Sequence, residues 1–497
     1  MSSSELPTII QGGMGVAVSG WRLAREVSLA GQLGVVSGTA LDVVLARRLQ
    51  LGDPGGHMRR ALAEFPFSNM AERILERYYI AGGKGPDTPF RLTSVPMIEM
   101  GDDQLALIVA GNFVEVFLAG EGHNGLVGVN YLEKIQAPTL ASLYGALLGG
   151  VDYVLMGAGI PRSIPGAIDR LSRGEAAELP IYVADAKPNE STVSRFDPES
   201  FGGGPPPALK RPKFLAIVAS VTLANMLARK ASGRVDGFVV EGPTAGGHNA
   251  PPRGEPVFNP LGEPVYGERD VVDLAQMRAI GLPFWLAGSY GTPEGLAAAL
   301  QEGAAGIQVG TAFAFCAESG LEDEVKRRVL AMSRAGTAAV LTDPVASPTG
   351  FPFKVLQLEG TLSDPAIYEA RERICDLGFL RQAYRREDGT IGWRCPGEPE
   401  ELYERKGGKL DDTPGRKCVC NALVANVGMA QQREGMGSEA PLITCGNDVC
   451  QIARFAPSDD AETYSARDVV NRLLAGASST AAAERETQVE RVAAAQS

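Results

Sequence analysis

Short, almost wholly apolar runs alternate with helical patterns from the start of the chain to about residue 315. Runs of this kind are typical of parallel strands that are buried on both faces, and most of them end in Gly, Ser or Asn. Eight such strands are predicted, at Thr8–Gly13, Leu33–Gly38, Leu126–Asn130, Tyr153–Gly157, Phe214–Ser220, Gly237–Gly242, Pro283–Ser289 and Gly306–Gly310.

Most of these runs are followed by a segment with helical periodicity. The clearest helices are predicted at Trp21–Ala30, Thr139–Leu148, Leu223–Ala231, Val271–Ile280 and Pro293–Gln301. Eight β-α units predict an α/β fold of the TIM-type (β/α)8 barrel class. A doubly wound sheet is the alternative, but it would usually carry its glycine fingerprint in the first unit. The strongest glycine signals here come late, where a barrel forms its phosphate site.

Two stretches interrupt the barrel, which is expected to span residues 1–320. Residues 43–122 are too long for one helix and are expected to form a helical insertion after the second strand. Residues 180–212 combine PIYVADA with a polar, Pro/Gly-rich segment, which predicts an extra strand and a surface loop.

The pattern changes after the eighth unit. Residues 321–465 are expected to form an irregular, Cys-containing extension that packs on the barrel and begins with a charged helix at Leu321–Ala335. Within it, the segment SPTGFPFK at 347–354 could fold back over the barrel mouth. Residues 466–497 are rich in Ala, Ser and Glu, and are expected to form a low-complexity tail that frays or is disordered.

Composition excludes several classes of function. The chain has 497 residues and a net charge of −12, so a nucleic-acid partner is not expected, because binding phosphates needs a basic surface. The N-terminus MSSSELPTII lacks the features of a secretory signal, and no run of about 18 uninterrupted apolar residues predicts a membrane span. Seven unevenly spaced cysteines favour reduced thiols and a cytoplasmic location.

A histidine in a glycine-rich loop is the strongest chemical signal. The segment GFVVEGPTAGGHN places His248 just after the sixth predicted strand. Glycines let a backbone approach a flat or phosphorylated ligand, and histidine can exchange protons near neutral pH. Because catalytic groups of TIM barrels lie at the carboxyl ends of strands, His248 is the candidate acid/base residue. The alternative is a loop histidine that only bonds the backbone.

At this point the chain resembles a known family, the flavin-dependent nitronate monooxygenases (formerly 2-nitropropane dioxygenases), which are related to the FMN-dependent enoyl-acyl-carrier-protein reductases. The likeness covers about residues 7–320, with family-like segments beyond. It rests on the order and position of the motifs IIQGGMG at 9–15, VGVN at 127–130, EGPTAGGHN at 241–249, AGSYG at 287–291 and QVGTAF at 308–313.

The resemblance implies an FMN-binding barrel, and by position it assigns residues to the flavin ring. Gly12, Gly13 and Met14 would lie along the ring, and Asn130 would offer a polar group to its edge. Gly246 and Gly247 would let the loop that carries His248 pass close to the cofactor.

The resemblance also assigns the cofactor's phosphate. Gly288, Ser289, Gly310 and Thr311 would hold it, with Gln308 beside it. Backbone N–H groups and a helix N-terminus form suitable anion cradles, which agrees with this assignment. The chain departs from the family at Ser289, where a second glycine is common, although a serine hydroxyl can also donate to phosphate.

Two reactions fit these motifs, both on small-molecule substrates. In a nitronate monooxygenase, His248 would bind the anionic substrate or take the α-proton of a nitroalkane, and O2 would receive the electrons. In an enoyl-thioester (or quinone) reductase, NAD(P)H would supply the electrons, His248 would protonate the α-carbon, and acyl carrier protein would be a partner. Nitronate oxidation ranks first because the overall pattern, including SPTGFP, is more similar to long nitronate monooxygenases.

A third reading is a non-catalytic barrel that binds flavin or a carrier protein. The oligomeric state stays open, with a homodimer as one option.

Three further features have weaker signals. His123, just before the third strand, could reach the barrel mouth and contact substrate, or could belong to a turn. His57 lies inside the helical insertion and is expected to be structural. No metal is expected, because Cys375, Cys395, Cys418 and Cys420 match no paired metal-binding spacing, although four thiolates could hold zinc or an iron–sulfur cluster.

Overall fold

The computed structural model describes residues 6–187, 190–435 and 437–475, and its centre is a parallel eight-stranded sheet. The strand order is β1-β11-β10-β9-β8-β4-β3-β2, and every ladder in this sheet is parallel. The strands are β1 (Ile9–Gln11), β2 (Gly34–Ser37), β3 (Val127–Leu132), β4 (Tyr153–Gly157), β8 (Lys213–Val218), β9 (Gly237–Glu241), β10 (Phe284–Ala287) and β11 (Gly306–Val309).

The two ends of the sheet, β1 and β2, meet and close the barrel. A parallel bridge joins Ile10 to Leu33, and the Leu33 N–H donates to the Ile9 carbonyl at 3.1 Å. The Gln11 N–H donates to the Leu33 carbonyl at 3.0 Å. Eight parallel strands in a nearly closed ring, with helices between them, confirm the TIM-type barrel over the doubly wound alternative.

Alternating strand residues fill the barrel interior. Ile10, Leu155 and Val239 are fully buried there, together with the indole of Trp285. The Trp285 Nε1–H donates to the Pro7 carbonyl at 2.7 Å, so the largest interior side chain has its polar atom satisfied. The strand residues that point outward pack against the surrounding helices.

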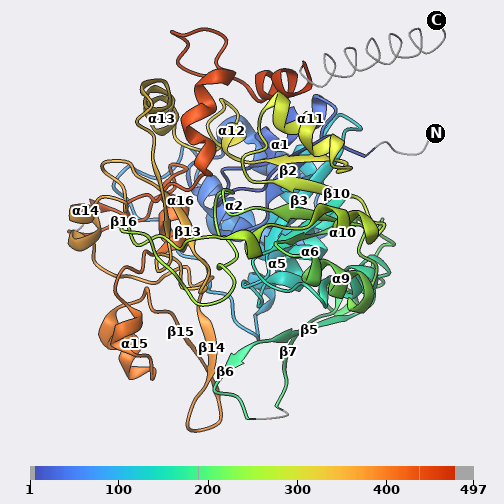
Figure 1. Cartoon of the computed structure of the whole chain (residues 1–497). Coiled ribbons are helices and arrows are strands. Elements are labelled where there is room, and N and C mark those ends of the chain that lie inside the picture. The colour runs from blue at the N-terminus through green and yellow to red at the C-terminus, as the bar shows by residue number, and fades with distance from the viewer. Residues whose placement is uncertain (1–5, 188–189, 436, 476–497) are drawn as a thin grey trace, which may run out of the picture.

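The helices that follow the strands lie around the sheet, outside the strands (Figure 1). They are α1 (Trp21–Leu29), α6 (Thr139–Leu148), α7 (Ile164–Ser172), α9 (Val221–Lys230), α10 (Leu274–Ala279), α11 (Pro293–Gln301) and α12 (Thr311–Ala314). Side-chain caps at Ser220, Asp273 and Thr292 each accept a backbone N–H in the first turn of α9, α10 and α11. The helix predicted from Val271 therefore starts three residues later, after its Asp273 cap.

The expected helical insertion follows β2. It contains α2 (Leu41–Gln50), η1 (Pro54–Gly56), α3 (His57–Ala63), α4 (Ser68–Tyr78) and α5 (Asp102–Gly120). By length and composition α5 could cross a membrane, but 72% of its most apolar window is buried inside the protein, as in a core helix. It packs against α2 and α6, and its buried Glu115 pairs with Arg48.

The second insertion is more ordered than the predicted strand and loop. An antiparallel pair forms from β5 (Ala177–Ile181) and β7 (Thr192–Phe196), followed by α8 (Pro198–Gly202). Between them, β6 (Val183–Ala184) pairs in parallel with β14 (Gln382–Arg385) of the C-terminal extension. In Figure 1 this region lies at the lower end of the molecule.

The C-terminal extension packs on the barrel and shares its core. Its elements are α13 (Asp323–Ala335), β12 (Val340–Asp343), β13 (Phe353–Leu356), α14 (Pro365–Ala370), β14 (Gln382–Arg385), β15 (Ile391–Arg394), α15 (Glu400–Arg405), η3 (Leu410–Asp412), α16 (Val419–Ala425), β16 (Gln432–Arg433), β17 (Gly437–Ser438) and η4 (Asn447–Phe455). A further short turn, η2 (Glu268–Asp270), precedes α10. The Tyr464 hydroxyl donates to the Ala312 carbonyl at 2.7 Å, which ties the extension to the end of the eighth unit.

The predicted low-complexity tail divides into two parts. Residues 466–475 are helical, and Val469, Val470 and Leu473 of this segment are buried in the core. The rest of the tail, 476–497, lies outside the described residues.

Candidate active site

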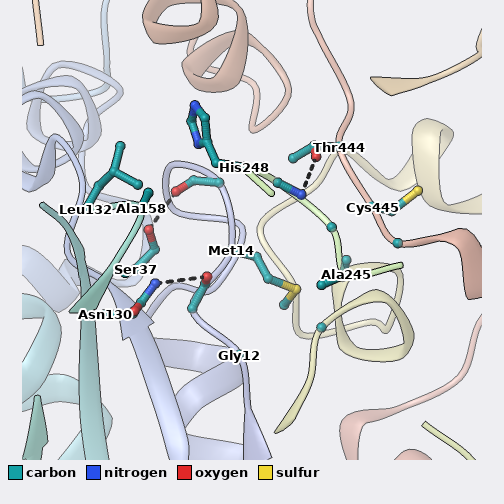
Figure 2. A pocket seen from close by; sticks show the side chains of 18 of the residues that line it. Gly12, Met14, Ser37, Asn130, Leu132, Ala158, Ala245, His248, Thr444 and Cys445 are labelled. Carbon is teal, nitrogen blue, oxygen red and sulfur yellow. Dashed lines mark hydrogen bonds between the residues drawn. The ribbon is translucent and has the colours of Figure 1, made fainter. Parts of the chain in front are cut away.

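One large pocket opens at the carboxyl ends of the barrel strands, where TIM barrels place their chemistry. The space inside the pocket and at its mouth is about 1450 Å³, part of which is open to solvent. It brings together every predicted cofactor residue and His248: Gly12, Gly13, Met14, Asn130, Gly246, Gly247, His248, Gly288, Ser289, Gln308, Gly310 and Thr311. Figure 2 shows Gly12, Met14 and Asn130 near the strand ends, with His248, Thr444 and Cys445 opposite them.

The turn after β1 needs glycine at position 13. A Cβ added to Gly13 would lie 2.4 Å from the Asn130 Cβ, a distance that no side chain tolerates. The Asn130 Nδ2 donates to the Gly13 carbonyl at 3.4 Å. The Ser19 hydroxyl donates to the Gly12 carbonyl at 2.9 Å and accepts the Met14 N–H at 3.0 Å, which fixes the turn.

Strained backbone gathers around this pocket. Ser289 has a φ of 59°, and Ala40 and Ala158, which also line the pocket, have φ of 55° and 51°. Left-handed conformations cost non-glycine residues roughly 1–2 kcal/mol each. Gly288 precedes Ser289 with a φ of 96°, so the loop after β10 has the backbone geometry of a two-glycine turn although its second residue is serine.

The pocket residues fit FMN. The Asn130 Oδ1 and the Gln308 Oε1 are buried with no hydrogen-bond partner in the protein. Buried polar atoms are rarely left unpaired, so both amides are suited to a polar ligand. The loops after β10 and β11 both line the cavity.

His248 is held by the C-terminal extension. Its Nε2 lies 2.7 Å from the Ser347 Oγ, and its ring packs edge-on against Phe353 with centroids 4.7 Å apart. The backbone of His248 forms an antiparallel bridge with Phe353, so the segment 347–354 does fold back onto this loop. Burial lowers the pKa of His248 from 6.5 to about 4. The imidazole is therefore neutral near pH 7.

Glu241, which sequence reasoning missed, is a second titratable group of the pocket. It is the last residue of β9 and lies seven positions before His248. Burial raises its pKa from 4.5 to about 8, so the carboxyl carries its proton near pH 7. The sequence does contain a signal for Glu241, because it is a charged residue at the end of an otherwise apolar strand.

The far wall of the pocket comes from residues 444–448, also missed because they lie more than 130 positions beyond the barrel motifs. The Gly247 N–H donates to the Thr444 Oγ1 at 3.0 Å, and the Gly446 N–H donates to the Thr311 Oγ1 at 3.0 Å. Asp448 lines the same wall. The extension thus joins both the histidine loop and the loop after β11.

His123 and His57 lie outside the pocket lining. His123 follows α5 and precedes β3, at the opposite end of the strand from Asn130, so it does not reach the substrate region at the barrel mouth. Its Nδ1 accepts the Gly125 N–H at 3.1 Å, and its Nε2 lies 2.7 Å from the Ala119 carbonyl. It forms a turn, which corrects the substrate-contact alternative. His57, which lies in the insertion, packs its ring against Trp21 of α1.

The cysteines of the extension are free thiols in the structure. Within residues 6–187, 190–435 and 437–475, no group of three or more His, Cys, Asp or Glu side chains has an arrangement that could hold a metal ion. Burial is the main cause that raises the pKa of Cys375, Cys395, Cys418 and Cys420. Cys420 also lines the pocket.

Part of the chain matches a known protein family. Residues 199–348, which include His248 and the loops after β9, β10 and β11, match the family model of nitronate monooxygenase. A nitronate monooxygenase of Pseudomonas aeruginosa is 33% identical over 159 residues, which cover 31% of this chain and 43% of that relative.

Relatives with a different name match as well. A (3aS,4S,5R,7aS)-5-hydroxy-7a-methyl-1-oxo-octahydro-1H-indene-4-carboxyl-CoA dehydrogenase of Mycobacterium tuberculosis is 34% identical over 143 residues, 29% of this chain and 36% of that protein. The matched part of the chain thus spans less than half the length of each of these two curated relatives. Among solved structures, FabK from Thermotoga maritima has a TM-score of 0.48 at 17% identity, covering 97% of this chain and 96% of that one.

Proposed function

We propose that this chain is an FMN-dependent oxidoreductase that oxidises alkyl nitronates with O2. The observation that carries the proposal is the neutral, half-buried His248 in a cavity that also collects every residue expected to hold the cofactor. The match of residues 199–348 to the nitronate monooxygenase family supports the same class of reaction.

The chain's residues would hold the two ends of the cofactor. Gly12, Gly13 and Met14 would lie along the flavin ring, and the unpaired Asn130 and Gln308 oxygens would accept its polar hydrogens. Gly288, Ser289, Gly310 and Thr311 would surround the phosphate. When bound, the flavin supplies the electron transfer between substrate and O2, which no side chain can provide.

His248 would handle the proton. As a neutral imidazole it can accept the α-proton of a nitroalkane, which leaves the substrate as the nitronate anion and the histidine as imidazolium. It can equally donate one N–H to a nitronate oxygen. Ser347 would position the ring, because its hydroxyl contacts Nε2 and fixes which nitrogen faces the substrate.

A second candidate is reduction of an enoyl thioester (or quinone) at the same FMN site, with NAD(P)H as electron donor. The observation in its favour is Glu241, a protonated carboxylic acid in the pocket that could give a proton to the carbon beside the thioester carbonyl. A relative named as a CoA dehydrogenase adds a thioester to the substrates worth testing, with acyl carrier protein as the alternative carrier. His248, with its pKa near 4, is a poor proton donor at neutral pH.

Anaerobic reduction of the bound flavin discriminates between the two reactions. Bleaching by propionate 3-nitronate or an alkyl nitronate, without response to NADH or NADPH, is the result expected for the monooxygenase. Bleaching by NAD(P)H alone, with reoxidation by an enoyl thioester, would replace it with the reductase.

The variant His248→Ala tests the role of the histidine. We expect turnover with a neutral nitroalkane to fall by 10²–10⁴-fold, the range for loss of a general base, while flavin stays bound. The matched control is His123→Ala, because that histidine lies outside the pocket lining. Turnover unchanged in His248→Ala on all these substrates would favour the non-catalytic flavin- or carrier-binding barrel.

A further inference from the structure

An acidic side chain lies among the loops proposed to bind the phosphate. Asp448, in the first turn of η4, is hydrogen-bonded to the Thr311 hydroxyl. Its Oδ2 is 3.6 Å from the point where a Cβ on Gly291 would lie, and its Oδ1 is 2.8 Å from the corresponding point on Gly446. The carboxyl group therefore stands between the loop after β10 and the loop after β11.

The hydroxyl of Thr311 links this carboxylate directly to the proposed phosphate donors. It accepts the Gly446 N–H at 3.0 Å, and its hydrogen bond with Asp448 lowers the pKa of that carboxyl against the larger effect of burial. A phosphate oxygen that needs this donor would have to share it with Asp448. The Asp448 carboxylate and a phosphate that both contact this hydroxyl are like charges, and they would repel each other strongly in a partly enclosed site.

No basic side chain compensates at the pocket surface. The described residues that line the pocket include no lysine or arginine. The charged and titratable groups that act on Asp448 or are acted on by it are Arg454 of η4, the Cys445 thiol and the Tyr464 phenol. Arg454 is directed to Gln451, with 2.8 Å between its Nη2 and the Oε1 of that side chain. Burial raises the pKa of Asp448, which eases its protonation.

We propose that Asp448 sets the affinity of this site for the phosphate of its cofactor: the phosphate binds with uptake of one proton by Asp448, which then donates a hydrogen bond to a phosphate oxygen. This inference rests on the proposed FMN function and adds that flavin loading depends on pH. A flavin without phosphate binds without this proton.

Flavin titrations of the full chain, freed of flavin, test the proposal. Dissociation constants for FMN and for riboflavin, which lacks the phosphate, are measured by flavin fluorescence from pH 7 to 9, above the second phosphate pKa of about 6. Glu241 of the same pocket has a pKa of about 8 and acts on both flavins. We therefore expect the ratio of the FMN constant to the riboflavin constant to rise with pH, at most about tenfold per unit for one proton.

The variant Asp448→Asn removes the charge and keeps the shape. We expect it to bind FMN at least about tenfold more tightly than the natural chain at pH 9, with a ratio of the two constants that no longer changes with pH because the titrating group is lost. Riboflavin binding should change little. The matched control is Asp459→Asn, an exposed carboxylate of the same extension, which should behave as the natural chain.

A second measurement does not depend on the variant folding. Calorimetry of the natural chain in two buffers of different ionisation enthalpy counts the protons taken up, and we expect up to one more proton for FMN than for riboflavin. Equal proton uptake for both flavins, or equal weakening of the binding of both by Asp448→Asn, would overturn the inference. Asp448 would then act on the ribityl chain that both flavins share. Binding of neither flavin at any pH would overturn the proposed function itself.

Discussion

Two titratable side chains of the pocket are shifted in opposite directions. Burial lowers the pKa of His248 to about 4 and raises the pKa of Glu241 to about 8, so both are neutral between these values. Pairs whose environments separate their pKa values are typical of sites that need one base and one acid at the same pH. The protein therefore holds a neutral imidazole and a neutral carboxyl together in one cavity near pH 7.

These shifts predict how stability depends on pH. His248 has a folded pKa below its ordinary 6.5, so its contribution is present above pH 6.5 and is lost as pH falls towards 4, by up to about 3 kcal/mol. Glu241 has a folded pKa above 4.5, so its contribution is present below pH 4.5 and is lost as pH rises through 8. Urea unfolding of the natural chain across pH 4–9 measures both.

Matched variants separate the two groups. We expect His248→Asn to flatten the acidic limb of the stability profile only, and Glu241→Gln to flatten the basic limb only. His123→Asn, at the other end of the barrel, serves as the control. Unchanged limbs in both variants would mean that neither side chain is buried in solution.

Single residues also show what the sequence could and could not predict. His248 was identifiable because a histidine among glycines after an apolar strand has few packing explanations. Its partner Ser347 lies 99 positions later, and no periodicity links the two residues. Ser289 could be read as a departure from a two-glycine motif, but only the backbone shows that it adopts the glycine-like φ of 59°.

At the scale of elements, the loop after β9 and the segment 444–446 are packed backbone to backbone. A Cβ on Gly246 would lie 2.8 Å from the Cys445 carbonyl carbon and 2.9 Å from the Gly446 nitrogen, whereas a Cβ on Gly247 would meet nothing within 4 Å. Gly247 has a φ of 78°, so alanine there is strained but not crowded.

This contrast predicts different costs for two neighbouring substitutions. Gly246→Ala should lower the free energy of unfolding of the flavin-free chain by roughly 1–3 kcal/mol through overpacking and weaken flavin binding by moving the wall. Gly247→Ala should cost only the left-handed strain, about 1 kcal/mol after the gain from a stiffer unfolded chain. Denaturant titrations of both variants measure the difference. Equal losses would contradict the tight contact between these two segments.

Elements of the barrel were predictable because each parallel strand is apolar on both faces. The predicted strand Tyr153–Gly157 and the predicted helices Thr139–Leu148 and Pro293–Gln301 match β4, α6 and α11 residue for residue. Short strands of the extension, such as β14 and β15, have four residues each and mixed polarity, so they have no comparable signature. The strand that pairs with β14, β6, comes from an insertion about 200 residues earlier.

At the scale of the whole molecule, the thiols of the chain differ in exposure. Of the seven thiols, only Cys450 is exposed. We expect one thiol of the native protein to react rapidly with a disulfide reagent and the other six to react only after unfolding. Cys450→Ser should abolish the rapid reaction, because the remaining thiols have pKa values raised mainly by burial.

Metal analysis completes this test. Less than stoichiometric zinc and iron in the purified protein, together with protection that a chelator does not remove, agrees with burial. Stoichiometric metal, or rapid reaction of Cys418 and Cys420 after chelation, would contradict it and restore a site built from Cys375, Cys395, Cys418 and Cys420.

The hydrogen bond from Gly446 to Thr311 joins positions 135 residues apart and has a consequence for how the protein is made. During synthesis, all eight strands leave the ribosome well before the segment that completes the pocket. At about 5–20 residues per second, this interval lasts roughly 7–27 s. Throughout it the far wall of the pocket is still missing, so the proposed cofactor site is completed late in the synthesis of each new chain.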